Sequence, residues 1–202
     1  MKITEIKGHA IVLPGNDIDT DRIIPARYLK EITFTNMGNY VFFDERFDEQ
    51  KNKKEHSFNV PKFKGANILI VQKNFGCGSS REHAVHALQK FGIQCIIGES
   101  FAGIFETNCL NLGIPIVTAG QAEIETLMKF IEKFPETKLK ISLIEKNIQF
   151  TGNQISLKIN ESSQKAFLTG TWNSTQIMKE NQKEIQKTVQ KIPYLNGFIQ
   201  KV

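Results

Sequence analysis

Apolar and polar positions follow different periods along the chain, and each period predicts a different kind of element. In the middle of the chain, apolar runs of strand length alternate with segments whose apolar residues recur every three or four positions, as on one face of a helix. Strands are predicted at residues 68–72, 93–97 and 114–117, and helices at 81–91, 101–112 and 121–133. This order predicts parallel strands joined by right-handed crossovers, with the proline-containing third strand at an edge or end position.

Beyond residue 138, apolar positions alternate with polar ones. This period of two predicts an antiparallel meander over residues 139–159 with a turn at Thr151-Gly152. A short helix is predicted at 162–169, and a basic amphipathic helix at 174–191. We expect the tail, residues 193–202, to be loosely ordered.

The pattern before residue 67 is less regular. Residues 3–13 predict one strand, and residues 31–66 predict an irregular excursion whose many aromatic side chains pack within this chain rather than on a partner. The periods together predict an α/β protein with a mixed sheet, in which parallel βαβ crossovers are combined with antiparallel strands. We expect a single domain over residues 1–202, with 161–202 as a helical C-terminal extension.

Composition narrows the class of protein. The 202 residues are 40% apolar and 23% charged, which is ordinary for a soluble globular protein with a real core. No long apolar span and no signal-peptide pattern occur, so a cytoplasmic protein without membrane association is expected. The net charge of +5 comes largely from lysine clusters without interleaved aromatic residues, which favours solvated surface over nucleic-acid binding.

The strongest candidate for chemistry is the loop at residues 74–80, between a predicted strand and a predicted helix. Its two glycines and the following helix N-terminus would point N–H groups and a favourable dipole at one spot, which suits carboxylate or phosphate. Arg81 adds a fork that can bind a carboxylate through two parallel hydrogen bonds. Ser79 and Ser80 add two hydroxyl groups. We interpret this loop as one wall of an active site for an anionic substrate.

Three rival interpretations account for only part of this loop. A capping box, with Ser79 as N-cap and Glu82 three residues later, would explain one serine and the glutamate but not the glycines or Arg81. A phosphate-binding P-loop would need a lysine that is absent. A dinucleotide fingerprint would start at Gly76-x-Gly78, but Arg81 occupies the third glycine position.

Two further groups of residues are candidates for a metal site or for a nucleophile. His83 and His86 lie three residues apart on the predicted helix, but surface or interface histidines are the favoured interpretation. Cys77 lies at a helix start, where a thiol can react, although the three cysteines are too scattered for a disulfide framework or a complete metal site.

A third group is the acidic segment 16–22, which resembles the start of a calcium loop but lacks its glycine and glutamate. From the residues alone, a turn that caps the next element and a loop that lines a site explain this segment equally well.

Three blocks of the sequence resemble the swivelling domain of the aconitase superfamily. They are Asp19–Pro25, Asn74–Ala84, and Ser100–Cys109 with Gly113-Ile114-Pro115 after it. The blocks occur in the right order, and the resemblance covers roughly residues 5–195. The first block has the form found in isopropylmalate isomerases.

This resemblance implies a three-layer β/β/α swivelling domain and a hydro-lyase. Such an enzyme removes water from a small hydroxy dicarboxylate and adds it back across an alkene, here between 2- and 3-isopropylmalate in leucine biosynthesis. The resemblance further implies that this chain is a small subunit that binds no cofactor or metal itself. A [4Fe–4S] cluster is expected on a separate large subunit, the partner with which alone the chain would be active, as a heterodimer or heterotetramer. The scattered cysteines of this chain agree with that division.

Carried over position by position, the resemblance implies that Ser79 is the base that removes a proton next to a carboxylate. It implies that Arg81 binds a substrate carboxylate and that Ser80 helps to position it. Thr20 and Asp21 are implied to lie nearby, where they support protonation and substrate binding.

The resemblance implies contacts with the variable part of the substrate for the segment 25–30, including Arg27 and Lys30. Asn108 is implied to hold the loop rather than to touch substrate. Homoaconitase and citraconate or methylmalate hydratases share these motifs, so a related hydro-lyase remains an alternative. A non-catalytic partner-binding module and a dinucleotide-binding oxidoreductase also stand as hypotheses.

Overall fold

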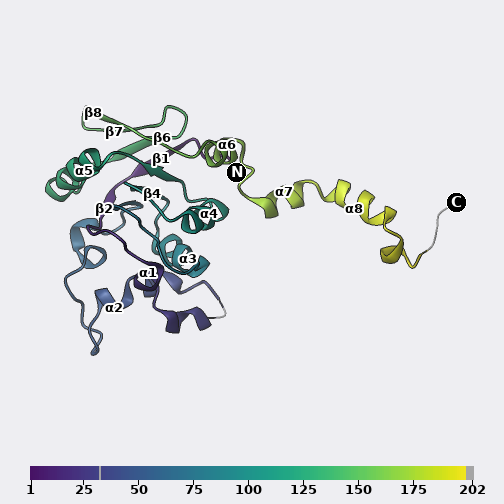
Figure 1. Cartoon of the computed structure of the whole chain (residues 1–202), viewed down its shortest axis with the longest axis horizontal. Helices are drawn as coiled ribbons and strands as arrows, with labels where there is room; N and C mark the ends of the chain where they lie inside the picture. The colour runs from purple at the N-terminus through teal and green to yellow at the C-terminus, as the bar shows by residue number, and fades with distance from the viewer. Residues whose placement is uncertain (32, 199–202) are drawn as a thin grey trace.

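The computed structural model describes residues 1–31 and 33–198, which are organised around two four-stranded sheets. The parallel sheet has the order β2-β3-β4-β5, formed by Ala10–Val12, Ile68–Ile70, Cys95–Gly98 and Ile116–Thr118. The antiparallel sheet has the order β1-β6-β7-β8, formed by Glu5–Gly8, Leu139–Ser142, Asn147–Phe150 and Asn153–Ser156. Figure 1 shows the antiparallel sheet on one side of the parallel sheet and helices α3 and α4 on the other.

The predicted crossovers of the parallel sheet are confirmed. Helix α3 (Glu82–Phe91) joins β3 to β4, and α4 (Gly103–Asn111) joins β4 to β5, which lies at the edge as expected. Every residue of β2, β3 and β4 is buried. Strands covered on both faces appear in sequence as continuous apolar runs, which is the pattern found here. Helix α5 (Gln121–Lys133) follows with the predicted bounds and packs near β2.

The antiparallel meander is also confirmed, but the N-terminal prediction needs correction. Residues 3–13 form two strands rather than one, because the chain passes from one sheet to the other at His9. At this corner a Cβ on Gly8 would lie 1.6 Å from Oδ1 of Asn67, whose amide donates to the Lys7 carbonyl at 3.0 Å. The α/β fold class is confirmed, with parallel and antiparallel strands as predicted, but these lie in two sheets and not in one mixed sheet.

The excursion from residue 31 to residue 66 contains short helical turns. They are η2 (Met37–Tyr40), α2 (Phe43–Arg46), η3 (Ser57–Asn59) and η4 (Pro61–Phe63), preceded by α1 (Thr20–Ile23) and η1 (Ala26–Lys30). Phe42, Phe58 and Phe63 are buried, so the expectation that its aromatics pack within this chain is confirmed for these three residues.

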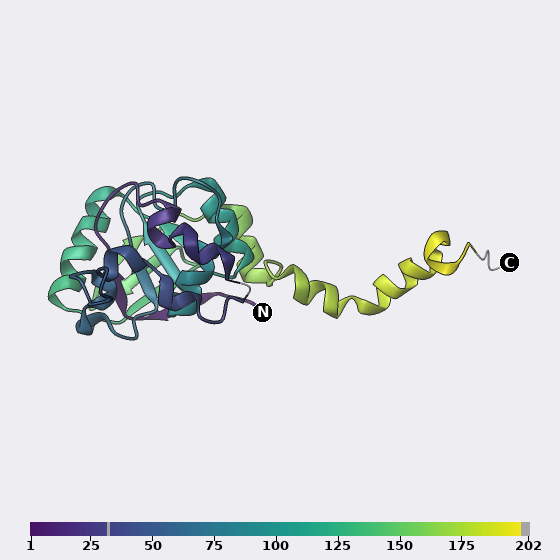
Figure 2. The ribbon, with the colours of Figure 1, turned by 90° about the horizontal axis from the view of Figure 1, so that it is seen from below.

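The C-terminal region divides into a packed helix and a projecting arm. Helix α6 (Glu161–Thr169) belongs to the body, because Phe167 is buried and its carbonyl accepts the Ile3 N–H at 2.9 Å. Beyond it, α7 (Ser174–Glu180), α8 (Gln182–Lys191) and η5 (Pro193–Asn196) extend away from the body (Figures 1 and 2). The single helix predicted at 174–191 is thus split, and residues 199–202 of the predicted tail lie outside the described residues. Of the helices described, none is long and apolar enough to span a membrane.

Candidate active site

The glycine loop, residues 74–80 between β3 and α3, packs against aromatic side chains. Gly76 and Gly78 have φ of 76° and 86°, in the left-handed region that favours glycine. A Cβ on Gly76 would lie 2.2 Å from Cγ of Phe105. Phe105 and Phe101 meet the ring of Phe75 edge to face, with centroids 5.4 and 6.4 Å apart. The path of the loop therefore requires a residue without a side chain at position 76.

The glycine loop is also held by Ser100, from the third block that resembles the aconitase superfamily. Sequence reasoning did not single out this residue. The Asn74 N–H donates to Oγ of Ser100 at 2.9 Å, and the Gly76 N–H donates to the Ile18 carbonyl at 2.7 Å. No hydrogen bond from the Asn108 side chain to the loop is found in the described part of the chain, so Ser100 holds the loop where Asn108 was expected to. The signal for Ser100 was its place just beyond a parallel strand, where sites collect.

The start of α3 leaves both loop hydroxyls unused in capping. The rival interpretation as a capping box is contradicted, because α3 begins at Glu82 and its N-cap is Arg81, with extended backbone and no side-chain cap. Ser79 and Ser80 are exposed. Because no side chain caps the helix, N–H groups of its first turn are open to an anion above the loop.

Helix α1 forms a second wall that is bonded directly to the loop. Oγ1 of Thr20, a buried residue, donates to the Ser79 carbonyl at 2.7 Å, and the Thr20 N–H donates to the Cys77 carbonyl at 3.0 Å. The carboxylate of Asp21 forms an ion pair with the half-buried guanidinium of Arg81. Four of the predicted site residues, from two distant segments, are therefore brought together.

The acidic segment before α1 divides into three separate roles. Oδ1 of Asp17 accepts from the Asn74 amide at 2.7 Å, and Oδ1 of Asp19 caps α1 by accepting the Arg22 N–H at 2.8 Å. Asp21 is the one that faces Arg81. The capping interpretation is therefore confirmed, and the same segment also places Asp21 against Arg81 beside the glycine loop.

The predicted substrate contacts Arg27 and Lys30 lie on η1, apart from this cluster. Nη1 of Arg27 donates to Asp44 at 2.9 Å, and this carboxylate raises the pKa of Arg27. Its guanidinium lies 4.7 Å from the ring of Tyr28, which stacks on Tyr40 with centroids 4.0 Å apart. Arg27 and these rings line an open groove of about 1020 Å³. Within the described residues, no hydrogen bond or ion pair joins Arg27 or Lys30 to the glycine loop.

The two histidines of α3 pack against the excursion. The ring of His86 stacks on Phe34 with centroids 3.8 Å apart, and its Nε2 lies 3.2 Å from Oε1 of Glu82. Desolvation lowers the pKa of His86. Among the residues that the structure describes, no three histidine, cysteine or acidic side chains gather where they could hold a metal ion.

The cysteines do not fit the ligand set of an iron–sulfur cluster, which needs several neighbouring thiolates. Cys95 and Cys109 are fully buried, and burial raises the pKa of Cys95 to about 12 and that of Cys109 as well. Burial and the nearby Asp19 also raise the pKa of Cys77. Cys77 also does not lie at the start of a helix as expected for a reactive thiol, because α3 begins only at Glu82.

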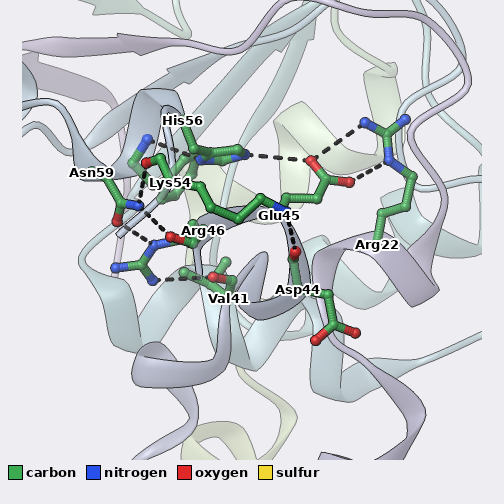
Figure 3. A network of polar contacts seen from close by, with 9 residues as sticks. Arg22, Val41, Asp44, Glu45, Arg46, Lys54, His56 and Asn59 are labelled. Atoms are coloured by element: carbon green, nitrogen blue, oxygen red, sulfur yellow. Dashed lines mark hydrogen bonds and ion pairs between the residues drawn. The ribbon is translucent and has the colours of Figure 1, made fainter. Parts of the chain in front are cut away.

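A polar network behind α1 was not predicted at all. Figure 3 shows the carboxylate of Glu45, on α2, between the guanidinium of Arg22 and the imidazole of His56. Oε1 accepts from Arg22 Nε at 2.6 Å, and Oε2 lies 3.4 Å from His56 Nε2. The neighbouring His56 and Arg22 side chains lower the pKa of Glu45 to about 2. Charged residues in irregular segments carry no periodic signal that would have marked this contact.

Replacing Glu45 with glutamine should destabilise the protein at neutral pH by about 1.5–3 kcal/mol, the scale of hydrogen bonds to a charged group. The Glu45 pKa is lowered from its ordinary value of about 4.5 to about 2, so ionised Glu45 stabilises the folded state above pH 4.5 and that contribution is lost as the pH falls through 2. Urea unfolding of both proteins between pH 7 and pH 2 should show the stability gap closing below pH 4.5. A gap that stays constant over this range would contradict the assignment.

Comparison with known proteins adds to this geometry. Residues 1–121 match the family described as Aconitase C-terminal domain. The chain is 42% identical over 193 residues to a Thermus thermophilus protein called 3-isopropylmalate dehydratase small subunit, with 96% of each chain covered. A Synechocystis protein of the same name is 40% identical over 195 residues, again with 96% of each covered. The crystal structure of a 3-isopropylmalate dehydratase from Methanocaldococcus jannaschii superposes with a TM-score of 0.67 at 29% identity, covering 91% of this chain and 98% of that one.

Proposed function

The chain belongs to the aconitase C-terminal domain family, and from that premise we propose that it is the small subunit of a 3-isopropylmalate dehydratase. This enzyme would isomerise 2-isopropylmalate to 3-isopropylmalate by dehydration and rehydration. The observation that carries the proposal is the uncapped serine–arginine loop held against α1, in a chain that matches relatives of this name over nearly its whole length.

The chemistry assigned to this chain follows from the loop. Asp21 holds Arg81 in place, and the rest of the guanidinium fork is proposed to bind a substrate carboxylate, beside Ser80. Ser79, free of any capping role, is proposed to act as its oxyanion, which accepts the proton next to that carboxylate and becomes the neutral hydroxyl. A serine oxyanion is a poor species in water, and the open N–H groups and dipole of α3 supply the stabilisation that it needs.

The remaining chemistry is proposed to belong to a partner. A [4Fe–4S] cluster on a large subunit would act as a Lewis acid toward the substrate hydroxyl. This chain would bind and orient the carboxylate, exclude water and move the proton at Ser79.

Related hydro-lyases are the alternative, because the distinction depends on the part of the substrate that varies. Arg27 and the aromatic groove beside it are the proposed contacts for that part. A hydrophobic pocket discriminates one or two methylene groups only modestly. Homoaconitase and citraconate hydratase activities are therefore measured together with the activity on 2-isopropylmalate.

The test is alkene formation from 2-isopropylmalate, followed by ultraviolet absorbance. This chain alone, a cluster-loaded large subunit alone and the mixture are compared, and activity is expected only in the mixture. If a mixture with a verified cluster turns over citraconate or homoaconitate instead, the chain is the small subunit of a related hydro-lyase. If it turns over none of them, the chain is a non-catalytic module.

A further inference from the structure

We propose that Glu45 is a positioning residue, which fixes the active-site carboxylate of Asp21 by holding Arg22 from the rear of α1. Glu45 touches neither the glycine loop nor a predicted substrate contact. Its kinetic effect rests on the function proposed above, whereas its effect on the loop can be measured without activity.

Helix α1 needs such support because it is one turn long. A four-residue helix does not hold its own conformation in water, so its orientation is set by its tertiary contacts. Thr20 and Asp21 contact the glycine loop on one side. Arg22 leaves on the other side toward α2, where Oε1 of Glu45 accepts from Nε at 2.6 Å and Oε2 from Nη2 at 3.4 Å.

The acceptor is itself well anchored. Helix α2 starts after Phe42, a fully buried residue in the left-handed conformation whose N–H donates to the Ile23 carbonyl of α1 at 2.8 Å. On the other side of the carboxylate, Nε2 of His56 lies 3.4 Å from Oε2 of Glu45 (Figure 3). Its Nδ1 accepts the Phe58 N–H at 3.2 Å, which holds the ring beside the carboxylate.

The charge of Glu45 has a specific consequence for the site. Its carboxylate pairs with the Arg22 guanidinium on the side of α1 away from the glycine loop, and Asp21 pairs with Arg81 on the other side. Because one helical turn carries both contacts, loss of the Glu45 charge would release the rear contact and let Asp21 shift relative to Arg81.

The kinetic test is a double-mutant cycle in the reconstituted enzyme. Glu45→Gln should lower kcat/KM about tenfold, chiefly by raising KM, because Arg81 loses its fixed orientation. In a protein that already carries Asp21→Asn, the same change should cost less than about twofold, because the residue through which Glu45 acts is gone. An equal loss in both backgrounds would overturn the proposal.

Asn59→Ala provides the matched control. The Asn59 amide donates to the carbonyls of Arg46 at 2.6 Å and Lys54 at 3.0 Å, so its loss loosens the same excursion without touching Arg22. This variant should lower the melting temperature but keep kcat/KM within about twofold of the wild-type value. If it matches the loss caused by Glu45→Gln, the effect is general loosening and the positioning role is excluded.

Hydrogen exchange in the isolated chain provides a readout that needs no partner. The Thr20 amide, bonded to the Cys77 carbonyl, should exchange several-fold faster in Glu45→Gln than in wild type or Asn59→Ala. Unchanged exchange would overturn the proposal even if activity fell. Inactivity of the wild-type mixture on every substrate would instead refute the proposed function. Hydrogen exchange of the Thr20 amide would then still decide whether Glu45 positions α1.

Discussion

Ser79→Ala is expected to lower kcat of the assembled enzyme by about a hundred- to ten-thousandfold, the range contributed by a general base. KM should change little, because the carboxylate contacts of Arg81 remain. The hydroxyl can be removed cleanly, since it caps no helix and only the Ser79 backbone carbonyl is bonded to Thr20. Steady-state kinetics with 2-isopropylmalate measures the effect.

Ser80→Ala is the matched comparison for this change. Ser80 is also exposed and lies next to Ser79 in the loop, but it is assigned to positioning the carboxylate, so its loss should act mainly on KM. Both variants should bind the large subunit as tightly as wild type. A Ser79→Ala enzyme that retains more than about a tenth of wild-type kcat would remove Ser79 from its role as base.

Gly76→Ala is expected to have the largest effect on stability, a loss of about 3 kcal/mol or more. Two costs add at this position. The left-handed backbone costs an L-residue about 1–2 kcal/mol, and the added methyl group would lie 2.2 Å from the ring of Phe105, an overpacking cost of about 1–3 kcal/mol. Urea unfolding followed by circular dichroism gives the free energy of unfolding.

Gly65→Ala separates the two costs. Gly65 has nearly the same φ, 78° against 76°, but a Cβ there would meet nothing within 4 Å. It should therefore show the backbone cost alone. Equal losses at the two positions would mean that the contact with Phe105 does not limit residue 76.

The features that could be predicted well from the sequence are those that its local periods determine. The bounds of α5 agree with the prediction because a long amphipathic stripe is flanked by Gly120 and Phe134. The glycine loop was recognisable because Gly76 and Gly78 stand between a buried strand and a helix. Pairing of Thr20 and Asp21 with the loop was expected from the family resemblance alone, and no local pattern indicates it.

The features that could not be predicted depend on contacts between distant segments. Where β1 passes into the second sheet, Asn67 lies so close to Gly8 that a side chain there would clash. The uncapped start of α3 follows from backbone geometry at Arg81, where the residue pattern alone fits a capping box. Glu45 is one of many charged residues in an irregular region, and only the folded chain brings it to Arg22.

The division of the first strands between two sheets has a consequence for synthesis of the chain. Strand β1 leaves the ribosome first but pairs with β6, so Gly8 must wait for Leu139. At about 5–20 residues per second, that wait lasts on the order of ten seconds or more. The four strands of the parallel sheet all leave the ribosome during this interval, because β5, the last of them, ends at Thr118. A nascent chain can thus assemble the sheet that carries the glycine loop while one apolar face is still uncovered, and the meander closes over that face last.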